Sequence, residues 1–401
     1  MSVTRRTILA ASAAACSPSP SGRRGHDAIV VGAGVFGAWT AEHLRRAGKR
    51  VLLVDQMGPA NARASSGGES RMTRSAYGSD AIYTQMALAS LEEWKRLSER
   101  ASLPVFHNCG VLFFFEEMVG YARQSLAVHR DLNLSLEQLD AAELRRRWPQ
   151  LNFEGVEFGL FEPDFGALMA RRGVEETVAR FVVQGGEYRL AHAEPGPTGR
   201  EVLLDGEQTS AEAIVYACGP WLPKVFPDLL SERIFVTRQE VAFIAPPDGD
   251  DSFEPEHLPG WADFNGGDLY YGFPNLEGRG FKIARDTHGP HFDPDTGDRQ
   301  ISEEGASLLR AFAERRFPAL MGRPFTEFRV CQYENSSNGD FLIDRHPTSE
   351  GAFLLGAGSG HGFKHGPEVG RLMAKLVLYG AVPDPRFSLA AKATVQAREV
   401  L

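Results

Sequence analysis

The stretch "DAIVVGAGVFGAWTAEHLRRAGKRVLLVD", residues 27–55, decides the fold. Apolar residues 28–31 and 51–54 predict two short buried strands, and a helical pattern starts near Ala38 between them. A strand, a helix and a second strand in this order are typical of a Rossmann-type unit. Asp55 ends the second strand, where a carboxylate can accept hydrogen bonds from ribose hydroxyls. The stretch therefore predicts a dinucleotide site.

Three glycines in this stretch have the G-x-G-x-x-G spacing. Gly32 permits a tight turn, Gly34 lets the backbone approach a pyrophosphate, and Gly37 lets the helix pack on the strand. The pyrophosphate would then lie at the helix N-terminus, next to Val35 and Phe36, where free N–H groups favour negative charge.

Later segments indicate which dinucleotide is bound. Residues 211–221, "AEAIVYACGPW", read as a strand that ends in small residues, so Ala217 and Gly219 can come close to a ligand. Residues 182–194 read as a helix end, a glycine turn and a strand. These segments lie far along the chain from residues 27–55 but are expected in the same nucleotide-binding domain. A domain made of widely separated segments favours an interrupted FAD fold over a continuous NAD domain.

Composition limits the classes of partner. The chain has 401 residues, which is long enough for two hydrophobic cores. Of these, 43% are hydrophobic and 24% are charged, a composition typical of globular proteins. Its net charge of -9 argues against nucleic acid or an anionic membrane as the main partner. The 4 cysteines are too few and too scattered for a disulfide framework or a zinc site, so we expect no metal.

The N-terminus resembles a twin-arginine export signal. Arg5 and Arg6 precede an apolar stretch, residues 8–15, that is too short to cross a bilayer. Cys16 follows this stretch, and its lipidation is left open. We therefore expect a periplasmic or exported protein without a membrane span; the alternative is an extension that leaves the protein in the cytoplasm.

Four further stretches resemble one known family. The chain is similar to the monomeric sarcosine oxidase and N-methyltryptophan oxidase branch of the D-amino-acid-oxidase-like flavoproteins, from about Asp27 to Leu389. The motifs that carry the resemblance are "SSGGESRMTRSAYG" (65–78), "YYGFPNLEGRGFKIARDTHG" (270–289), "VCQYENSSNGDFLIDRHP" (330–347) and "GSGHGFKHGPEVG" (358–370).

The resemblance implies a mixed α/β fold of two domains. A Rossmann-type FAD-binding domain is interrupted by a substrate domain with a mixed sheet over the flavin. We expect the export signal and linker in residues 1–25, the FAD-binding domain in 26–105, 168–238 and 330–395, and the substrate domain in 106–167 and 239–329.

Two arginines and a lysine are candidates for the active site. If residues 65–78 were helical, Arg71 and Arg74 would share a face, and from the sequence alone this could be a solvated basic surface. The resemblance implies that Arg71 lies beside the flavin ring, whereas Arg74 and Lys364 hold the substrate carboxylate. Gly67 departs from the family, because sarcosine oxidases carry histidine at that position.

Other candidates lie in the second and third motifs. Lys282 in an expected strand could point to solvent, but the resemblance makes it the lysine over the flavin that speeds the reaction with oxygen. Tyr271 matches an active-site tyrosine, and Asp286 replaces a histidine near the flavin. Cys331 could be an ordinary buried thiol; the resemblance implies that it attaches covalently to the flavin 8α position.

The last motif predicts a loop followed by a helix. Gly358, Gly360 and Gly362, together with Lys364, would come close to the cofactor, and Pro367 suits the first turn of a helix whose N-terminus points at the flavin.

We therefore expect an FAD-dependent oxidase of an amino acid or N-methyl amino acid. Hydride would pass from the amine carbon to flavin N5, and oxygen would reoxidise the flavin to give hydrogen peroxide. We expect a monomer whose partners are a small amine or amino acid and O2. The alternatives are an exported dehydrogenase that uses a quinone or carrier, and a flavin-binding protein without amino-acid turnover.

Overall fold

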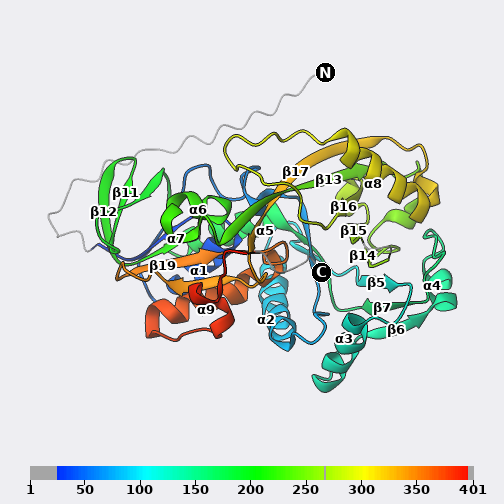
Figure 1. Cartoon of the computed structure of the whole chain (residues 1–401), viewed down its shortest axis with the longest axis horizontal. Coiled ribbons are helices and arrows are strands. Elements are labelled where there is room, and N and C mark those ends of the chain that lie inside the picture. Colours follow the sequence, from blue (N-terminus) through cyan, green and yellow to red (C-terminus); the bar gives the residue numbers. More distant parts are fainter. Residues whose placement is uncertain (1–24, 266–267, 396–401) are drawn as a thin grey trace.

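The computed structural model describes residues 25–265 and 268–395. Two large sheets lie side by side, one toward the left of Figure 1 with β12 and β19, the other toward the right with β14–β16 and β5–β7. The expected export signal and Cys16 lie outside the described residues.

The first sheet is the nucleotide-binding core. Its central strands run in parallel in the order β9, β2, β1, β12, β19. β18 pairs antiparallel with β19, and β10 and β11 extend β12. The strands are β1 (His26–Val31), β2 (Val51–Asp55), β9 (Glu187–Leu190), β10 (Ala193–Pro195), β11 (Glu201–Leu204), β12 (Glu207–Tyr216), β18 (Leu342–Arg345) and β19 (Ala352–Gly356).

Four helices pack beside this sheet: α1 (Val35–Arg46), α2 (Ala81–Ser98), α5 (Ala170–Val183) and α9 (Gly366–Tyr379). α1 lies between α5 and α9. A Cβ atom at Gly370 would lie 2.6 Å from the backbone carbon of Trp39, so α9 approaches α1 as closely as only glycine allows. The expected βαβ unit and the helix after Pro367 are confirmed.

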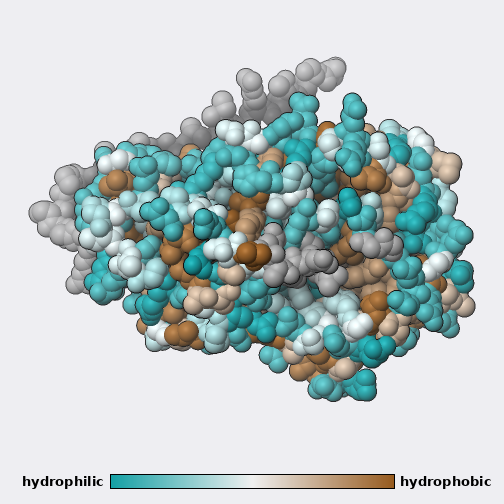
Figure 2. Space-filling model, in the orientation of Figure 1, coloured by the Kyte–Doolittle hydropathy of each residue, from teal (hydrophilic) through white to brown (hydrophobic). Residues whose placement is uncertain are grey.

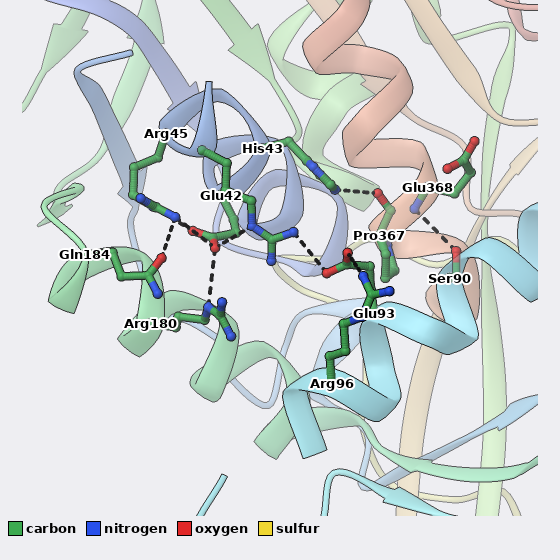
Figure 3. Close-up of polar contacts among 11 residues, drawn as sticks. Glu42, His43, Arg45, Ser90, Glu93, Arg96, Arg180, Gln184, Pro367 and Glu368 are labelled. Atoms are coloured by element: carbon green, nitrogen blue, oxygen red, sulfur yellow. Dashed lines mark hydrogen bonds and ion pairs between the residues drawn. The ribbon is translucent and has the colours of Figure 1, made fainter. Parts of the chain in front are cut away.

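The outer end of α1 carries a charged group that we call the Glu42 cluster: Glu42, Arg45, Arg46 and Arg180. The Glu42 side chain is 1% exposed, and its carboxylate pairs with Arg45 Nε at 2.9 Å, Arg46 Nε at 2.8 Å and Arg180 Nε at 3.5 Å. Figure 3 shows Glu42, Arg45 and Arg180 converging between α1 and α5. Arg46 also pairs with Glu93 of α2, at 2.9 Å. The cluster therefore joins three helices.

The second sheet is mixed. Its strand order is β17, β13, β16, β15, β14, β5, β7, β6, with one parallel pair between β14 and β5. The strands are β5 (Val111–Phe115), β6 (Glu137–Asp140), β7 (Phe158–Glu162), β13 (Ile234–Ile244), β14 (Gly260–Asp263), β15 (Tyr270–Phe273), β16 (Phe281–Arg285) and β17 (Phe325–Ser336).

One face of the second sheet packs on α8 (Glu303–Arg316). Phe281 and Ile283 of β16 belong to this core, with Phe312 of α8. Since successive residues of a strand point to opposite faces, Lys282 and Ala284 must lie on the other face. That face is free to form the wall of a site.

A small antiparallel sheet joins the two parts. It consists of β3 (Ser70–Thr73), β8 (Gly166–Met169) and β4 (Phe106–His107). The helical arrangement considered for Arg71 and Arg74 is therefore wrong: Arg71 lies in a strand whose backbone bonds go to β8, and Arg74 follows its end.

The remaining elements are short or peripheral. They are the helices α3 (Gly120–Asp131), α4 (Ala141–Arg147), α6 (Leu222–Val225) and α7 (Pro227–Leu230), and the single turns η1 (Ser65–Gly67), η2 (Gly219–Trp221), η3 (Asp251–Phe253), η4 (Leu276–Gly278), η5 (Pro318–Leu320), η6 (Phe363–His365), η7 (Pro385–Phe387) and η8 (Leu389–Ala391).

The mixed α/β class predicted from the sequence is confirmed. The expected domain boundaries at 238/239 and 329/330 fall inside β13 and β17, so the division into domains stays a prediction. Figure 2 shows a mostly hydrophilic face on which hydrophobic residues form small patches. Among the helices described, none combines the length and the apolar character that crossing a bilayer needs.

Candidate functional site

A cavity of about 480 Å³ lies where the first sheet ends and the second sheet begins. It is lined by residues from both sheets and from the loop before η6. The predicted cofactor residues in its wall are Gly32, Gly34, Val35, Phe36, Asp55, Arg71, Ala217, Gly219, Gly358, Gly360 and Gly362. Gly37, Cys331 and Lys364, also predicted, are not among its lining residues.

The packing of the glycine turn explains why Gly37 is not in the cavity wall. Gly32 has φ +105°, and a Cβ atom there would lie 2.3 Å from the carbonyl oxygen of Ala217. A Cβ atom at Gly37 would lie 1.8 Å from the carbonyl oxygen of Gly32. Both glycines therefore permit close packing: Gly32 packs against Ala217, and Gly37 lets α1 pack on the turn, as its position in the motif implies.

The N-terminus of α1 points into this cavity with help from a residue that sequence reasoning missed. Ser66 Oγ accepts the N–H of Val35 at 3.0 Å. The serine belongs to the motif that also carries Arg71, so it connects the glycine turn to the small third sheet.

Asp55 lies at the end of β2, in the wall of the cavity. Its carboxylate accepts the N–H of Ala33 at 2.8 Å and the N–H of Met57 at 2.8 Å. Burial raises the pKa of Asp55, and these backbone bonds oppose the rise. The acid thus fixes the turn and leaves lone pairs for a hydroxyl donor.

Strand register gathers the other candidates on one face of the second sheet. Cys331 of β17 is opposite Gln239 of β13, and Ala284 of β16 is opposite both Val241 and Tyr271. Because opposite residues of antiparallel strands share a face, Cys331, Tyr271 and Lys282 all lie on the face turned away from α8. The structure therefore places these three predicted residues on one face of the sheet.

Lys282 is buried, with 3% of its surface exposed, so the alternative that it points to solvent is wrong. Its Nζ donates to the carbonyl oxygen of Ser70 at 2.8 Å and to Ser70 Oγ at 3.2 Å. Burial and the neighbouring Arg71 lower the pKa of Lys282 to about 7. Among the described ion pairs, none joins this lysine to a carboxylate.

Arg71 links Lys282 to the cavity. Its guanidinium donates to the carbonyl oxygens of Ser70 at 2.8 Å and Ser65 at 2.6 Å, and it lies 5.9 Å from the ring of Phe363. A Cβ atom at Gly68 would lie 2.3 Å from the guanidinium, so this arginine position requires glycine beside it.

Tyr333 is a residue that sequence reasoning missed. It lines the cavity, and its hydroxyl donates to Asp286 Oδ1 at 2.8 Å. Burial first, and then Asp286, raise the pKa of Tyr333 well above its usual value, and the same two causes raise that of Tyr271 to about 12. The position two residues after Cys331 in a strand was a usable signal, because i and i+2 share a face.

Tyr77 brings the two predicted carboxylate-binding cations together. The Arg74 Cζ atom lies 4.2 Å from the centroid of the Tyr77 ring, and Lys364 Nζ lies 5.2 Å from it. The Tyr77 hydroxyl bonds to His365 Nε2 at 2.7 Å and His361 Nδ1 at 3.2 Å. We call Arg74, Tyr77, Lys364, His361 and His365 the Tyr77 cluster; sequence reasoning had given Tyr77 and the histidines no role.

A second buried group holds the chain just after Arg74. Glu162 Oε1 accepts the N–H of Ser75 at 2.8 Å and that of Ala76 at 3.1 Å. His129 Nε2 bonds to Ser75 Oγ at 2.9 Å, and Glu162 raises the pKa of His129 against the effect of burial. Arg74 itself is positioned by bonds to the carbonyl oxygen of Ala76 and, at 3.3 Å, to the Tyr121 hydroxyl.

Gly67, the departure from the family pattern, has a structural reason. A Cβ atom at Gly67 would lie 2.0 Å from the carbonyl oxygen of Asn61. No side chain fits on this backbone without a shift of residues 61–67.

A Rossmann-type cavity that is bordered by a mixed sheet bearing a buried lysine defines the class: a dinucleotide-dependent oxidoreductase. The sequence profile of the family described as "FAD dependent oxidoreductase" matches residues 27–376. The chain belongs to this family, and the resemblance inferred from the motifs is confirmed.

Two relatives are similar over nearly their whole length. Monomeric sarcosine oxidase of Streptomyces avermitilis is 31% identical over 369 residues, which cover 90% of this chain and 95% of the relative. N-methyl-L-tryptophan oxidase of Salmonella heidelberg is 28% identical over 367 residues, which cover 90% of this chain and 96% of the relative.

Solved structures show the same fold. L-proline dehydrogenase from P. horikoshii has a TM-score of 0.79 at 16% identity, covering 91% of this chain and 97% of its own. NikD, described as an unusual amino acid oxidase, has a TM-score of 0.75 at 20% identity, covering 94% of this chain and 98% of its own.

The residues of the cavity fit FAD. Gly34 lines the cavity where α1 begins, so a pyrophosphate can approach the helix N-terminus there. Asp55 stands where a ribose hydroxyl can donate. Arg71 and Tyr333 line the part of the cavity that borders Lys282 and Asp286.

Proposed function

We propose that this chain is an FAD-dependent oxidase of an amino acid or an N-methyl amino acid. The observation that carries the proposal is the Tyr77 cluster, in which Arg74 and Lys364 from distant parts of the sequence lie against one ring. The relatives named for sarcosine and N-methyl-L-tryptophan support the choice of substrate class.

Arg74 and Lys364 are the proposed carboxylate-binding residues. A guanidinium can pair with a carboxylate through two parallel hydrogen bonds, and an ammonium adds a point charge. Arg74 forms no ion pair with any carboxylate of the described residues. Its charge is therefore available for the carboxylate of a substrate.

The chemistry that bound FAD supplies is two-electron oxidation of the amine carbon and return of the electrons to O2, with hydrogen peroxide as the product. Lys282 is proposed to hold a positive charge where the reduction of oxygen develops negative charge. Its burial supports this role, because electrostatic stabilisation is strongest away from bulk water.

Asp286 and Tyr271 are proposed to border the substrate. Tyr333 donates to Asp286, and both tyrosines are held neutral by their raised pKa values, so they present hydroxyl groups to the site. The aspartate places negative charge where the resemblance implies histidine, and we expect Asp286→His to change the ranking of amine substrates in steady-state assays. An unchanged ranking would remove Asp286 from the substrate site.

Cys331 is proposed to carry the flavin through a thioether. Its place on the same sheet face as Lys282 and Tyr271 supports the proposal. The thiol is half-buried and forms no disulfide with either of the other two cysteines that the structure describes. Acid-precipitated protein should stay yellow, and Cys331→Ser should release its flavin on precipitation. Release of flavin from the unmodified protein would refute the attachment.

A screen of amines with peroxide detection in air tests the function. We expect peroxide with one or more amino acids or N-methyl amino acids, and none with the corresponding amines that lack the carboxylate at equal concentration. Turnover of carboxylate-free amines alone would contradict the proposal.

A dehydrogenase that passes electrons to a quinone or carrier is the second candidate. One observation favours it: with a pKa of about 7, Lys282 loses its charge as the pH rises through neutrality. Flavin reduction by substrate with slow reoxidation in air, and rapid reoxidation by an artificial quinone, would establish this candidate in place of the oxidase.

Export and oligomeric state complete the proposal. The twin-arginine-like pair supports a periplasmic location, because that route carries folded, cofactor-loaded proteins. Changing Arg5 and Arg6 to lysine should leave the protein in the cytoplasm, and unchanged localisation would remove the assignment. Light scattering should give the mass of a monomer.

A further inference from the structure

Glu334 is a buried acid in the wall of the cavity to which neither the motif nor the proposed reaction gives a role. It follows Tyr333 in β17 and lines the cavity, with 6% of its surface exposed. Its Oε1 atom has no hydrogen-bond partner among the described residues. A carboxyl oxygen without a partner inside a ligand cavity indicates that the ligand supplies one.

The surroundings of Glu334 come from the nucleotide-binding part. A Cβ atom at Gly356 would lie 2.4 Å from Glu334 Oε1, and one at Gly219 would lie 4.0 Å from Oε2. Both glycines also line the cavity. The carboxyl group therefore lies between the ends of β12 and β19, on the side of the cavity that contains the glycine turn.

Glu334 has no compensating cation in the part of the chain that the structure describes. Among the described ion pairs, Glu334 takes part in none. Glu334 acts on the Cys218 thiol, whose pKa is raised by burial first and then by Asp55 and Glu334. The backbone N–H groups of Ala357 and Gly358 are its polar neighbours.

The charge state follows from this environment. Burial raises the pKa of Glu334 to about 8, and the two backbone N–H groups oppose the rise. At neutral pH the side chain is therefore a carboxylic acid that can donate one O–H bond. An ionised carboxylate at this place would repel the pyrophosphate for which the cavity is built.

We propose that Glu334 binds FAD as an uncharged carboxylic acid that donates a hydrogen bond to an acceptor oxygen of the cofactor. Cofactor binding is then linked to one proton. FAD affinity is constant while the acid is protonated, and it falls by up to about tenfold per pH unit once the pH exceeds the pKa of the acid in the empty protein.

The test measures FAD affinity by quenching of flavin fluorescence between about pH 6 and about pH 9, with Lys282→Met in every variant because the pKa of Lys282, about 7, lies inside this range. The protein carries Cys331→Ser so that binding is reversible whether or not the natural attachment exists. We expect the Kd to be constant at low pH and to rise above about pH 8. With Glu334→Gln added, the amide keeps a donor and cannot ionise, so the Kd should stay flat.

Glu327→Gln is the matched control, because it changes a glutamate of the same strand that pairs with Arg279 and Arg329. It should keep the pH profile of the parent. A flat profile in the parent, or a slope that survives Glu334→Gln, would overturn the proposal.

A second measurement does not need the glutamine variant to fold. Calorimetric titration of the Cys331→Ser, Lys282→Met protein with FAD at about pH 9, in buffers of different ionisation enthalpy, should show uptake of close to one proton per FAD bound. Binding without proton uptake would exclude the proposal. Neither experiment requires turnover, so failure of the oxidase function leaves this result interpretable.

Discussion

The Glu42 cluster and the Tyr77 cluster treat positive charge differently. In the Glu42 cluster, Arg45, Arg46 and Arg180 each pair with one buried carboxylate (Figure 3). In the Tyr77 cluster, Arg74 contacts a carbonyl oxygen, a hydroxyl and two aromatic rings. In the Glu42 cluster the protein itself supplies the carboxylate that pairs with the arginines. In the Tyr77 cluster Arg74 can pair with the carboxylate of a bound ligand.

The difference shows what buried charge is for in each place. Removing two charges from water is costly and is offset only by good pairing geometry, which the Glu42 cluster has. A buried cation without a carboxylate partner from the protein lacks this stabilising pairing. Such a cation is typical of a functional site, where a bound ligand supplies the negative charge. Lys282 belongs with the second kind, because within residues 25–265 and 268–395 it donates hydrogen bonds to Ser70 and forms no ion pair with a carboxylate.

Removing the charge of Lys282 should have the largest effect. Lys282→Met keeps length and bulk, and it should slow reoxidation of the reduced protein by oxygen by ~10²–10³-fold while flavin reduction by substrate changes little. Stopped-flow absorbance measures both half-reactions. Because the pKa of Lys282 is lowered to about 7, reoxidation in the parent should also slow as the pH rises above that value. Fast reoxidation in the variant would contradict the role proposed for Lys282, and slow reoxidation already in the parent would contradict the oxidase assignment.

Removing the guanidinium of Arg74 should have the second largest effect. Arg74→Ala should weaken transition-state binding of a carboxylate-bearing substrate by about 2–4 kcal/mol, measured as kcat/KM. Any slow turnover of the matching amine without a carboxylate should be nearly indifferent to the change. Arg146→Ala, which alters an exposed arginine on α4, is the control. Equal losses on both substrates would make Arg74 a structural residue.

The Glu42 cluster should respond in stability and not in catalysis. Glu42→Gln should lower the free energy of unfolding by about 2 kcal/mol at neutral pH, with unchanged kcat/KM. Burial raises the pKa of Glu42, but the bonds from Arg45 and Arg46 outweigh it and leave the pKa below its usual value.

The sign of the pH effect follows from that lowered pKa. The contribution of Glu42 is fully present above the pKa of an unfolded glutamate and is lost as the pH falls through the lower folded value. Chemical denaturation at several pH values should therefore show the parent and Glu42→Gln converging in acid. A difference that persists unchanged at low pH would mean that the glutamine disturbs packing instead.

The sequence by itself determined the nucleotide-binding fold. Residues 27–55 predict β1, α1 and β2 because short apolar runs and helical patterns, together with glycines that need positive φ or close contact, are local properties. The motif resemblance then indicated the family, and 11 of the predicted cofactor residues line the cavity.

Only the tertiary structure decided the electrostatics of the site. Whether Lys282 faces solvent or the buried region beside Ser70 depends on which face of the second sheet α8 covers, and that is a contact between distant parts of the chain. The same holds for Tyr77, which joins Arg74 to Lys364, and for Glu334, whose pKa is raised by burial against β12 and β19. Burial and pairing are set by neighbours in space, and a sequence pattern records only neighbours along the chain.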